Sequence, residues 1–228
     1  MAFTFFFRDA EVLEMAVRNA LPILRGQAFI HIWDAGCAHG PEPYTLAIIL
    51  HQQMSEFVFR NVRIHATDVD VTFERFVRDG IYHDKELQRI PGNLRDRYFV
   101  PHGNSGDRQV IDDLRARVNF ARHDLLSSEP VRDGLAMVIC KNVLLHFNAQ
   151  QREKVVRMFY GALRKDGLLV MEHTQKLPEG LVALFQQVSA GAQIFRKVAS
   201  DTIRIDGKEP GAAPVGQFHT GRETRARL

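Results

Sequence analysis

Apolar residues recur along this chain at two alternating spacings. Residues 9–25 carry them at helical spacing, with Pro22 expected to kink or end the helix. Residues 28–33 and 62–70 are short β-rich runs, and a helix over about 42–51 is expected between them. This alternation of strands with helices predicts an α/β protein with a largely parallel sheet.

The second half of the chain continues the alternation with one interruption. A short helix is expected over 71–80, and two β-rich segments flanking a Gly-rich turn predict a hairpin subdomain inserted over 98–120. The most apolar run, 135–145, is the expected central strand. An amphipathic helix over 148–167, from an asparagine cap to a glycine, and a strand over 168–174 follow.

Composition narrows the class of protein. The 228 residues are 45% hydrophobic and 25% charged with a net charge of +3, which is the balance of a soluble globular domain. Residues 1–199 are expected to form one catalytic domain, and the Gly/Pro/Ala/Arg-rich residues 200–228 a mobile tail. No basic run interleaved with aromatics indicates nucleic-acid binding. The two cysteines and scattered histidines have no metal-ligand spacing.

Localisation is predicted from the same features. Two cysteines are too few for a disulfide framework and favour a reducing compartment. Arg8 and Asp9 interrupt the apolar start of the chain, so it does not have the pattern of a signal peptide. With no apolar run long enough for a membrane span, we expect a cytosolic protein. The oligomeric state stays open.

The stretch from Trp33 to Leu50 indicates a ligand. Gly36 and Gly40 would allow close backbone approach, and Asp34, Asp68 and Asp124 end three successive strand candidates. Three carboxylates at one sheet edge would repel a polyphosphate but suit a positively charged nucleoside. The loop also lacks the glycine spacing of dinucleotide sites and the lysine of a P-loop. S-adenosylmethionine is the predicted ligand, with the alternative that each aspartate only caps a helix.

Eight motifs occur in a fixed order between residues 3 and 177: FTFFFRD, IWDAGCAHGPEPYTLAI, HATDVD, GIY, RYF, VNFARHDLL, ICKNVLLHF and LLVMEHTQKL. Together they resemble the chemotaxis-receptor methyltransferase (CheR-type) family. The resemblance implies a class I methyltransferase (Rossmann-like) fold, a seven-stranded mostly parallel sheet with a small β-hairpin subdomain. It also implies S-adenosylmethionine as methyl donor, with S-adenosylhomocysteine as product.

The resemblance assigns roles by position. Thr4 and Arg8 match the residues beside the cofactor and the reacting methyl, and Glu42 matches the glutamate near the cofactor ammonium. Asp68 matches the acid that binds the ribose. These assignments make Arg8 a candidate catalytic residue as well as a cofactor contact.

Further cofactor contacts follow from the later motifs. Asp124 stands where the family has an asparagine beside the adenine, and Leu125 follows it. Asn142 and Val143 match the pair that lines the cofactor after the central strand. Together with the loop residues, they complete the predicted cofactor site, and no metal-binding residue is predicted.

Departures from the family pattern leave the acceptor open. Ala2, Pro41 and Lys141 replace the family's Asn, Glu and Arg, and His146 replaces an active-site Tyr. His146 is therefore a second candidate catalytic residue, because a neutral imidazole can take a proton from a hydroxyl. The family's N-terminal helical domain also has no counterpart, so weak methylation of receptors by this chain alone is expected.

Three functional hypotheses remain at this stage. The first is O-methylation of a carboxylate, by resemblance a protein glutamate. The second is O- or N-methylation of a small molecule in metabolism or natural-product biosynthesis, which the departures at His146 favour. The third is a non-catalytic module that binds S-adenosylmethionine. Retention of Arg8, Asp68 and Asn142 speaks against this third hypothesis.

Overall fold

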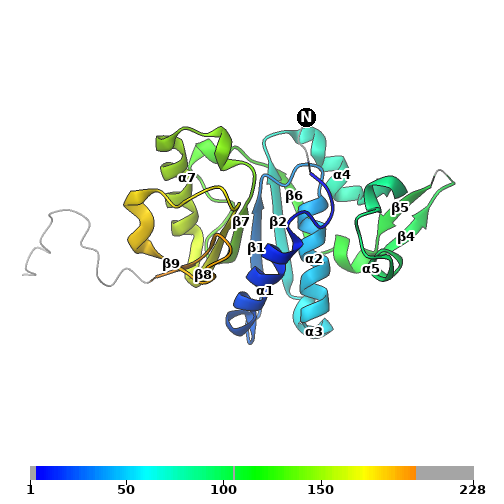
Figure 1. Ribbon diagram of the computed structural model, residues 1–228. Helices are drawn as coiled ribbons and strands as arrows, with labels where there is room; N and C mark the ends of the chain where they lie inside the picture. The colour runs from blue at the N-terminus through cyan, green and yellow to red at the C-terminus, as the bar shows by residue number, and fades with distance from the viewer. Residues whose placement is uncertain (1–3, 105, 199–228) are drawn as a thin grey trace, which may run out of the picture.

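The computed structural model describes residues 4–104 and 106–198, and its main feature is a seven-stranded sheet in the order β6-β2-β1-β7-β8-β10-β9 (Figure 1). The strands are β1 (Ile30–Ala35), β2 (Val62–Asp68), β6 (Val118–Arg122), β7 (Leu135–Cys140), β8 (Leu163–Met171), β9 (Phe185–Gln187) and β10 (Ile194–Lys197). The first five run parallel, whereas β10 is antiparallel to both β8 and β9. The predicted fold class is confirmed, with the most apolar strand, β7, at the centre.

Helices cover both faces of this sheet. α1 (Ala10–Leu24) and α2 (Pro41–Gln53) lie on one face, and α7 (Ala149–Ala162) lies on the other (Figure 1). The shorter helices and single turns are α3 (Glu56–Phe59), η1 (Val71–Phe73), α4 (Glu74–Asp79), η2 (Asp84–Leu87), α5 (Gly92–Tyr98), α6 (Asp112–Arg115), η3 (Leu125–Ser127), η4 (Leu144–His146) and η5 (Glu179–Leu184).

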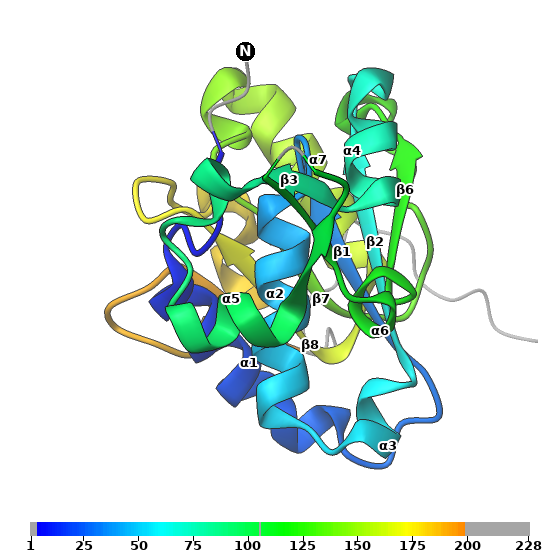
Figure 2. The same cartoon turned by 90° about the vertical axis from the view of Figure 1, so that its right-hand side faces the viewer.

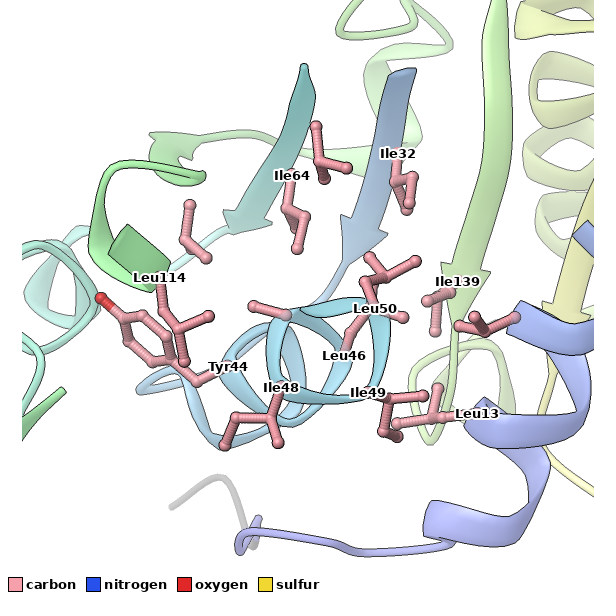
Figure 3. Packing of buried hydrophobic residues seen from close by; sticks show 14 of the residues in the cluster. Leu13, Ile32, Tyr44, Leu46, Ile48, Ile49, Leu50, Ile64, Leu114 and Ile139 are labelled. Atoms are coloured by element: carbon pink, nitrogen blue, oxygen red, sulfur yellow. The ribbon is translucent and has the colours of Figure 1, made fainter. Parts of the chain in front are cut away.

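Helix α2 is buried on all sides. Every residue from 43 to 50, PYTLAIIL, is buried, as expected for a helix that is apolar all round. In Figure 3, Leu46 and Leu50 lie toward the strands of Ile32 and Ile64, while Tyr44 lies toward Leu114. The core therefore fixes the position of α2. Its N-terminal end, which follows the glycine loop (residues 36–40), is held at the edge of the sheet.

Side chains of β1 point alternately to the two faces of the sheet and so belong to two separate hydrophobic clusters. Ile30 and Ile32 belong to the cluster under α1 and α2, whereas Trp33 and Ala35 belong to the cluster that contains α7. Trp33 packs edge-on against Phe159 of α7, with ring centroids 5.2 Å apart. The strand is thus anchored from both faces just before the loop that follows it.

A small antiparallel sheet lies beyond α2. Its strands β3 (Ile81–His83), β4 (Phe99–His102) and β5 (Asp107–Val110) are ordered β3-β5-β4, and Figure 2 shows this unit facing the viewer. The structure differs here from the predicted insertion over 98–120. β3 lies outside that range, and β6 at its end belongs to the large sheet. Both belong to pairings between distant segments, β3 with β5 and β6 with β2, which local turn signals do not reveal.

Two other boundaries differ from the sequence-based expectations. α7 is capped by Asn148 as predicted, but it ends at Ala162, because Leu163 is already extended. Gly167 therefore lies inside β8, where a Cβ would come within 3.0 Å of the Leu135 carbonyl oxygen. Pro22 lies within the last turn of α1, which ends two residues later. The predicted tail, 200–228, lies outside the described residues.

Candidate functional site

A cavity of about 670 Å³ opens at the carboxyl ends of the central parallel strands. This edge is where ligands bind in open α/β sheets. The lining comes from the carboxyl end of β2 and the segments that follow β1, β2, β6 and β7, together with Thr4, the N-terminal turn (residues 6–9) and α2. These residues are Thr4, Arg8, Gly36, Cys37, Ala38, Glu42, Thr67, Asp68, Val69, His123, Asp124, Leu125, Lys141, Asn142, Val143, Leu145, His146 and Phe147.

Ten of the predicted site residues line this one cavity, and two do not. The ten are Thr4, Arg8, Gly36, Glu42, Asp68, Asp124, Leu125, Asn142, Val143 and His146. Asp34 and Gly40 are absent from the lining. Gly40 begins α2 with φ +104°, and a Cβ there would come within 2.5 Å of the Tyr82 hydroxyl. Glycine is therefore required at position 40 because a larger residue would collide with the small sheet.

Gly36 lets the backbone pass close to the opposite cavity wall. Its φ is +98°, and a Cβ there would lie 2.2 Å from Cγ2 of Val143. The amides of Gly36 and Cys37 both donate to the carbonyl of Thr67, at 2.8 and 2.9 Å. The loop after β1 is thus tied to the end of β2, with its backbone at the cavity surface.

Asp68 is oriented by two backbone amides. Its carboxylate accepts a hydrogen bond from the Ala38 amide at 3.0 Å and another from the Asp70 amide at 3.1 Å. The first bond crosses from β2 to the glycine loop, so Asp68 both lines the cavity and fixes the loop.

Asp124 caps a short helical turn and also lines the cavity. Its carboxylate accepts from the Leu126 amide at 2.9 Å and caps η3. The capping alternative raised by the sequence is therefore observed at Asp124. It does not exclude ligand contact, because the residue also lines the cavity.

The N-terminal turn directs Arg8 to the cavity. Phe7 and Asp9, on either side of Arg8, have φ values of +62° and +50°, which side-chain-bearing residues rarely adopt. The Phe7 amide donates to the hydroxyl of Thr45 at 3.0 Å, which anchors the turn on α2. Arg8 Nη2 donates to Oδ1 of Asn142 at 2.8 Å. The half-buried guanidinium is therefore held against the end of the central strand.

Buried charges lie beside this turn. Lys141 Nζ is 3.0 Å from Glu42 and 3.1 Å from Asp9, and its side chain is only 1% exposed. Burial alone would lower the pKa of Lys141, but the two carboxylates outweigh it and raise that pKa, so the ammonium stays charged.

Asp34 lies beneath the cavity instead of lining it. Two residues after Ile32 in β1, its side chain points to the same face of the sheet as Ile32 and is fully buried. Among the described residues, no group meets either carboxylate oxygen as a hydrogen-bond partner of regular geometry. Burial, joined by the nearby Glu42 carboxylate, raises the pKa of Asp34 well above its usual range and favours the neutral acid. Strand alternation could have placed Asp34 under α2 from the sequence.

Eight further lining residues were not among the predicted site residues: Cys37, Ala38, Thr67, Val69, His123, Lys141, Leu145 and Phe147. Most are sequence neighbours of predicted site residues. Extending the candidate set by one residue on either side of each predicted position would have included them. Cys37 is 1% exposed, and this burial raises the pKa of its thiol well above its usual range, as is typical of an unreactive thiol.

The cavity mouth contains His146. It ends the short turn η4 and is exposed, next to Leu145, which is 46% exposed. Across the described residues, no three His, Cys, Asp or Glu side chains gather as ligands for a metal ion. None of the helices between residues 4 and 198 is long and apolar enough to cross a bilayer.

Comparison with known proteins adds a family match. Residues 2–194 match the model of the CheR methyltransferase SAM-binding domain. A chemotaxis protein methyltransferase of Vibrio cholerae is 28% identical over 76% of this chain and 62% of its own length. One of Borreliella burgdorferi is 29% identical over 76% of this chain and 64% of its own length. The chain thus spans less than two thirds of these relatives.

The fold has a counterpart among solved structures. A methyltransferase from Geobacter sulfurreducens superposes with a TM-score of 0.51, covering 84% of this chain and 79% of that chain. The two sequences are only 13% identical, so this likeness concerns the fold alone.

Proposed function

The chain belongs to the CheR family of S-adenosylmethionine-dependent methyltransferases, and from this premise we propose that it transfers a methyl group to a carboxylate, in the first instance a protein glutamate. The observation that carries the choice of acceptor is the position of Arg8. Its permanently charged guanidinium lines the cavity and is held there by Asn142. A guanidinium binds a carboxylate with matching two-pronged geometry.

The lining fits the cofactor. Glycine at position 36 brings the backbone to the cavity surface, and Glu42, Asp68 and Asp124 place carboxylates around it. These groups suit a nucleoside that carries ammonium and sulfonium charges, and about 670 Å³ is within the range of small-molecule sites. We infer that Asp68 would hold the ribose, Asp124 and Leu125 the adenine side, and Glu42 the ammonium. When bound, the cofactor supplies a methyl group activated for transfer.

Methylation of a carboxylate requires no proton transfer by the protein. It is already ionised at neutral pH, so no base is needed. Arg8 would orient the anion, and Asn142 would hold Arg8. Transfer then depends mainly on alignment and on exclusion of water.

The experiment that tests this proposal uses cofactor carrying a labelled methyl group. A purified cytoplasmic fragment of a chemotaxis receptor and a panel of small carboxylic acids serve as acceptors. Methyl esters release labelled methanol in mild alkali, whereas methyl ethers and methylamines do not. Alkali-labile incorporation is expected, at a low rate on the receptor fragment. Label that is stable to alkali in every active reaction would overturn the carboxylate assignment.

Replacing Asp68 is expected to weaken cofactor binding. Asp68→Ala removes a charged acceptor worth about 1.5–3 kcal/mol, so affinity for S-adenosylhomocysteine should fall about tenfold to a hundredfold. Calorimetric titration measures this. Asp70→Ala is the matched control, because Asp70 is exposed and absent from the cavity lining. Equal affinities for the wild type and Asp68→Ala would remove Asp68 from the proposed site.

The second candidate function is methylation of a small molecule bearing a hydroxyl or amine. It rests on His146, which lines the cavity mouth where a base would be useful. With a carboxylate acceptor, His146→Phe should keep turnover within about fivefold of wild type. With a hydroxyl acceptor, loss of a positioned base should cost about a hundredfold or more. Initial rates with the identified acceptor decide between the two, and His173→Phe, an exposed histidine outside the lining, is the control.

A further inference from the structure

Two consecutive residues directly after the central strand β7 contact two consecutive residues of the N-terminal turn. Asn142 accepts from Arg8 at 2.8 Å, and Lys141 pairs with Asp9 at 3.1 Å. Lys141 Nζ also lies 3.5 Å from the carbonyl oxygen of Arg8. We call these four residues the clasp. It joins segments more than 130 positions apart in the chain.

The turn that the clasp holds is strained. Positive φ at a residue other than glycine costs of order 1–3 kcal/mol and persists only when surrounding contacts enforce it. Phe7 and Asp9 both have such values, on either side of Arg8. The bond from the Phe7 amide to Thr45 secures one end of the turn, and the pair between Lys141 and Asp9 secures the other.

Lys141 is also tied to the cofactor side of the cavity. Its ammonium is 3.0 Å from Glu42, whose side chain is 11% exposed and lines the cavity. A buried cation is tolerated only when it is paired, and here two carboxylates from different segments pair with it. One ammonium therefore connects the turn that carries Arg8 with the carboxylate expected to face the cofactor.

We propose that Lys141 is a positioning residue, which sets the place of Arg8 by holding Asp9 and Glu42 at the same time. Its role in turnover rests on the proposed methyl transfer, whereas its hold on the turn does not. As a charged ammonium that is 1% exposed, it acts through its two carboxylate partners and serves as neither base nor nucleophile.

The first test measures the opening of the turn directly and does not depend on methyltransferase activity. Hydrogen exchange of the amides in residues 5–10 is compared between wild type, Lys141→Met and Lys141→Arg. Without the ammonium, the strained turn should open, and exchange at the Arg8 and Ala10 amides should quicken by about tenfold or more. Lys141→Arg should keep slow exchange. Amides of α7 serve as the internal reference, and Lys154→Met, an exposed lysine on α7, is the matched control.

The second test separates positioning from a general loss of structure. In Lys141→Met, turnover should fall about tenfold to a hundredfold, because misplacing a reacting group by an ångström can cost that much. Affinity for S-adenosylhomocysteine should fall by less than turnover does, and Lys141→Arg should restore most of the turnover. A parallel fall in affinity and turnover, with exchange quickened throughout the protein, would overturn the proposal.

Asp9→Asn provides a variant that leaves Lys141 and Glu42 paired. Asp9 is 49% exposed, so this change leaves no unpaired charge in the core and should fold even where Lys141→Met does not. It should quicken exchange in residues 5–10 in the same way. Unchanged exchange in a folded Asp9→Asn protein would show that the clasp does not hold the turn. If exchange responds but no carboxylate is methylated, the proposed acceptor fails and the clasp stands.

Discussion

Arg8→Ala is expected to lower turnover about a hundredfold to a thousandfold, the range seen when one oriented donor is removed from a charge-stabilising site. The reason lies in where the guanidinium is held. It lines the cavity from a turn with two strained residues and is fixed by Asn142 at 2.8 Å. Without it, the cavity loses the charge that would orient an anionic acceptor. Initial rates at saturating cofactor, with the acceptor varied, measure the effect.

Two variants show whether the charge or its geometry matters. Arg8→Lys keeps a positive charge but loses the planar fork that matches a carboxylate, so its turnover should lie about tenfold below wild type. Arg18→Ala, on the exposed side of α1, should be indistinguishable from wild type. If affinity for S-adenosylhomocysteine fell as far as turnover in Arg8→Ala, Arg8 would serve the cofactor and not the acceptor.

Much of the fold could be predicted because its signals are local. Runs of apolar residues ending in acid marked β1 and β2, and the run 135–145 marked the central strand, which is buried throughout. The antiparallel β10 and β9 could not be predicted in this way. Their pairing with β8 and with each other is set by tertiary contacts, and short segments of three or four residues carry little periodic signal.

The site could be predicted less completely, since motif position does not give side-chain direction. Asp34 and Asp68 both end parallel strands, but Asp34 points under α2 into the core, whereas Asp68 reaches the cavity. In the sequence, Lys141 stands out only because it replaces the family's arginine. Its pairing with Asp9 and Glu42 needs three segments brought together by the fold, which no local pattern encodes.

Replacing Gly36 should damage both stability and cofactor binding. Gly36→Ala places a Cβ 2.2 Å from Cγ2 of Val143 and puts an alanine at φ +98°. The strained φ costs about 1–3 kcal/mol. Overpacking adds a cost of about 1–3 kcal/mol. If the wall moves to relieve the clash, the cavity changes shape where the cofactor is expected. We therefore expect a loss of about 2–6 kcal/mol in the free energy of unfolding, together with at least a hundredfold weaker binding of S-adenosylhomocysteine.

Two matched variants separate these causes. Gly134→Ala also places alanine at positive φ, +73°, but with no atom within 4 Å of the new Cβ, so it should show the backbone cost alone and leave binding unchanged. Gly36→Ala combined with Val143→Ala removes the clash and keeps the strained φ, so it should recover part of the affinity. Denaturant unfolding and calorimetric titration measure both quantities. Wild-type affinity in Gly36→Ala would show that the close approach of the loop to Val143 is not part of the cofactor site.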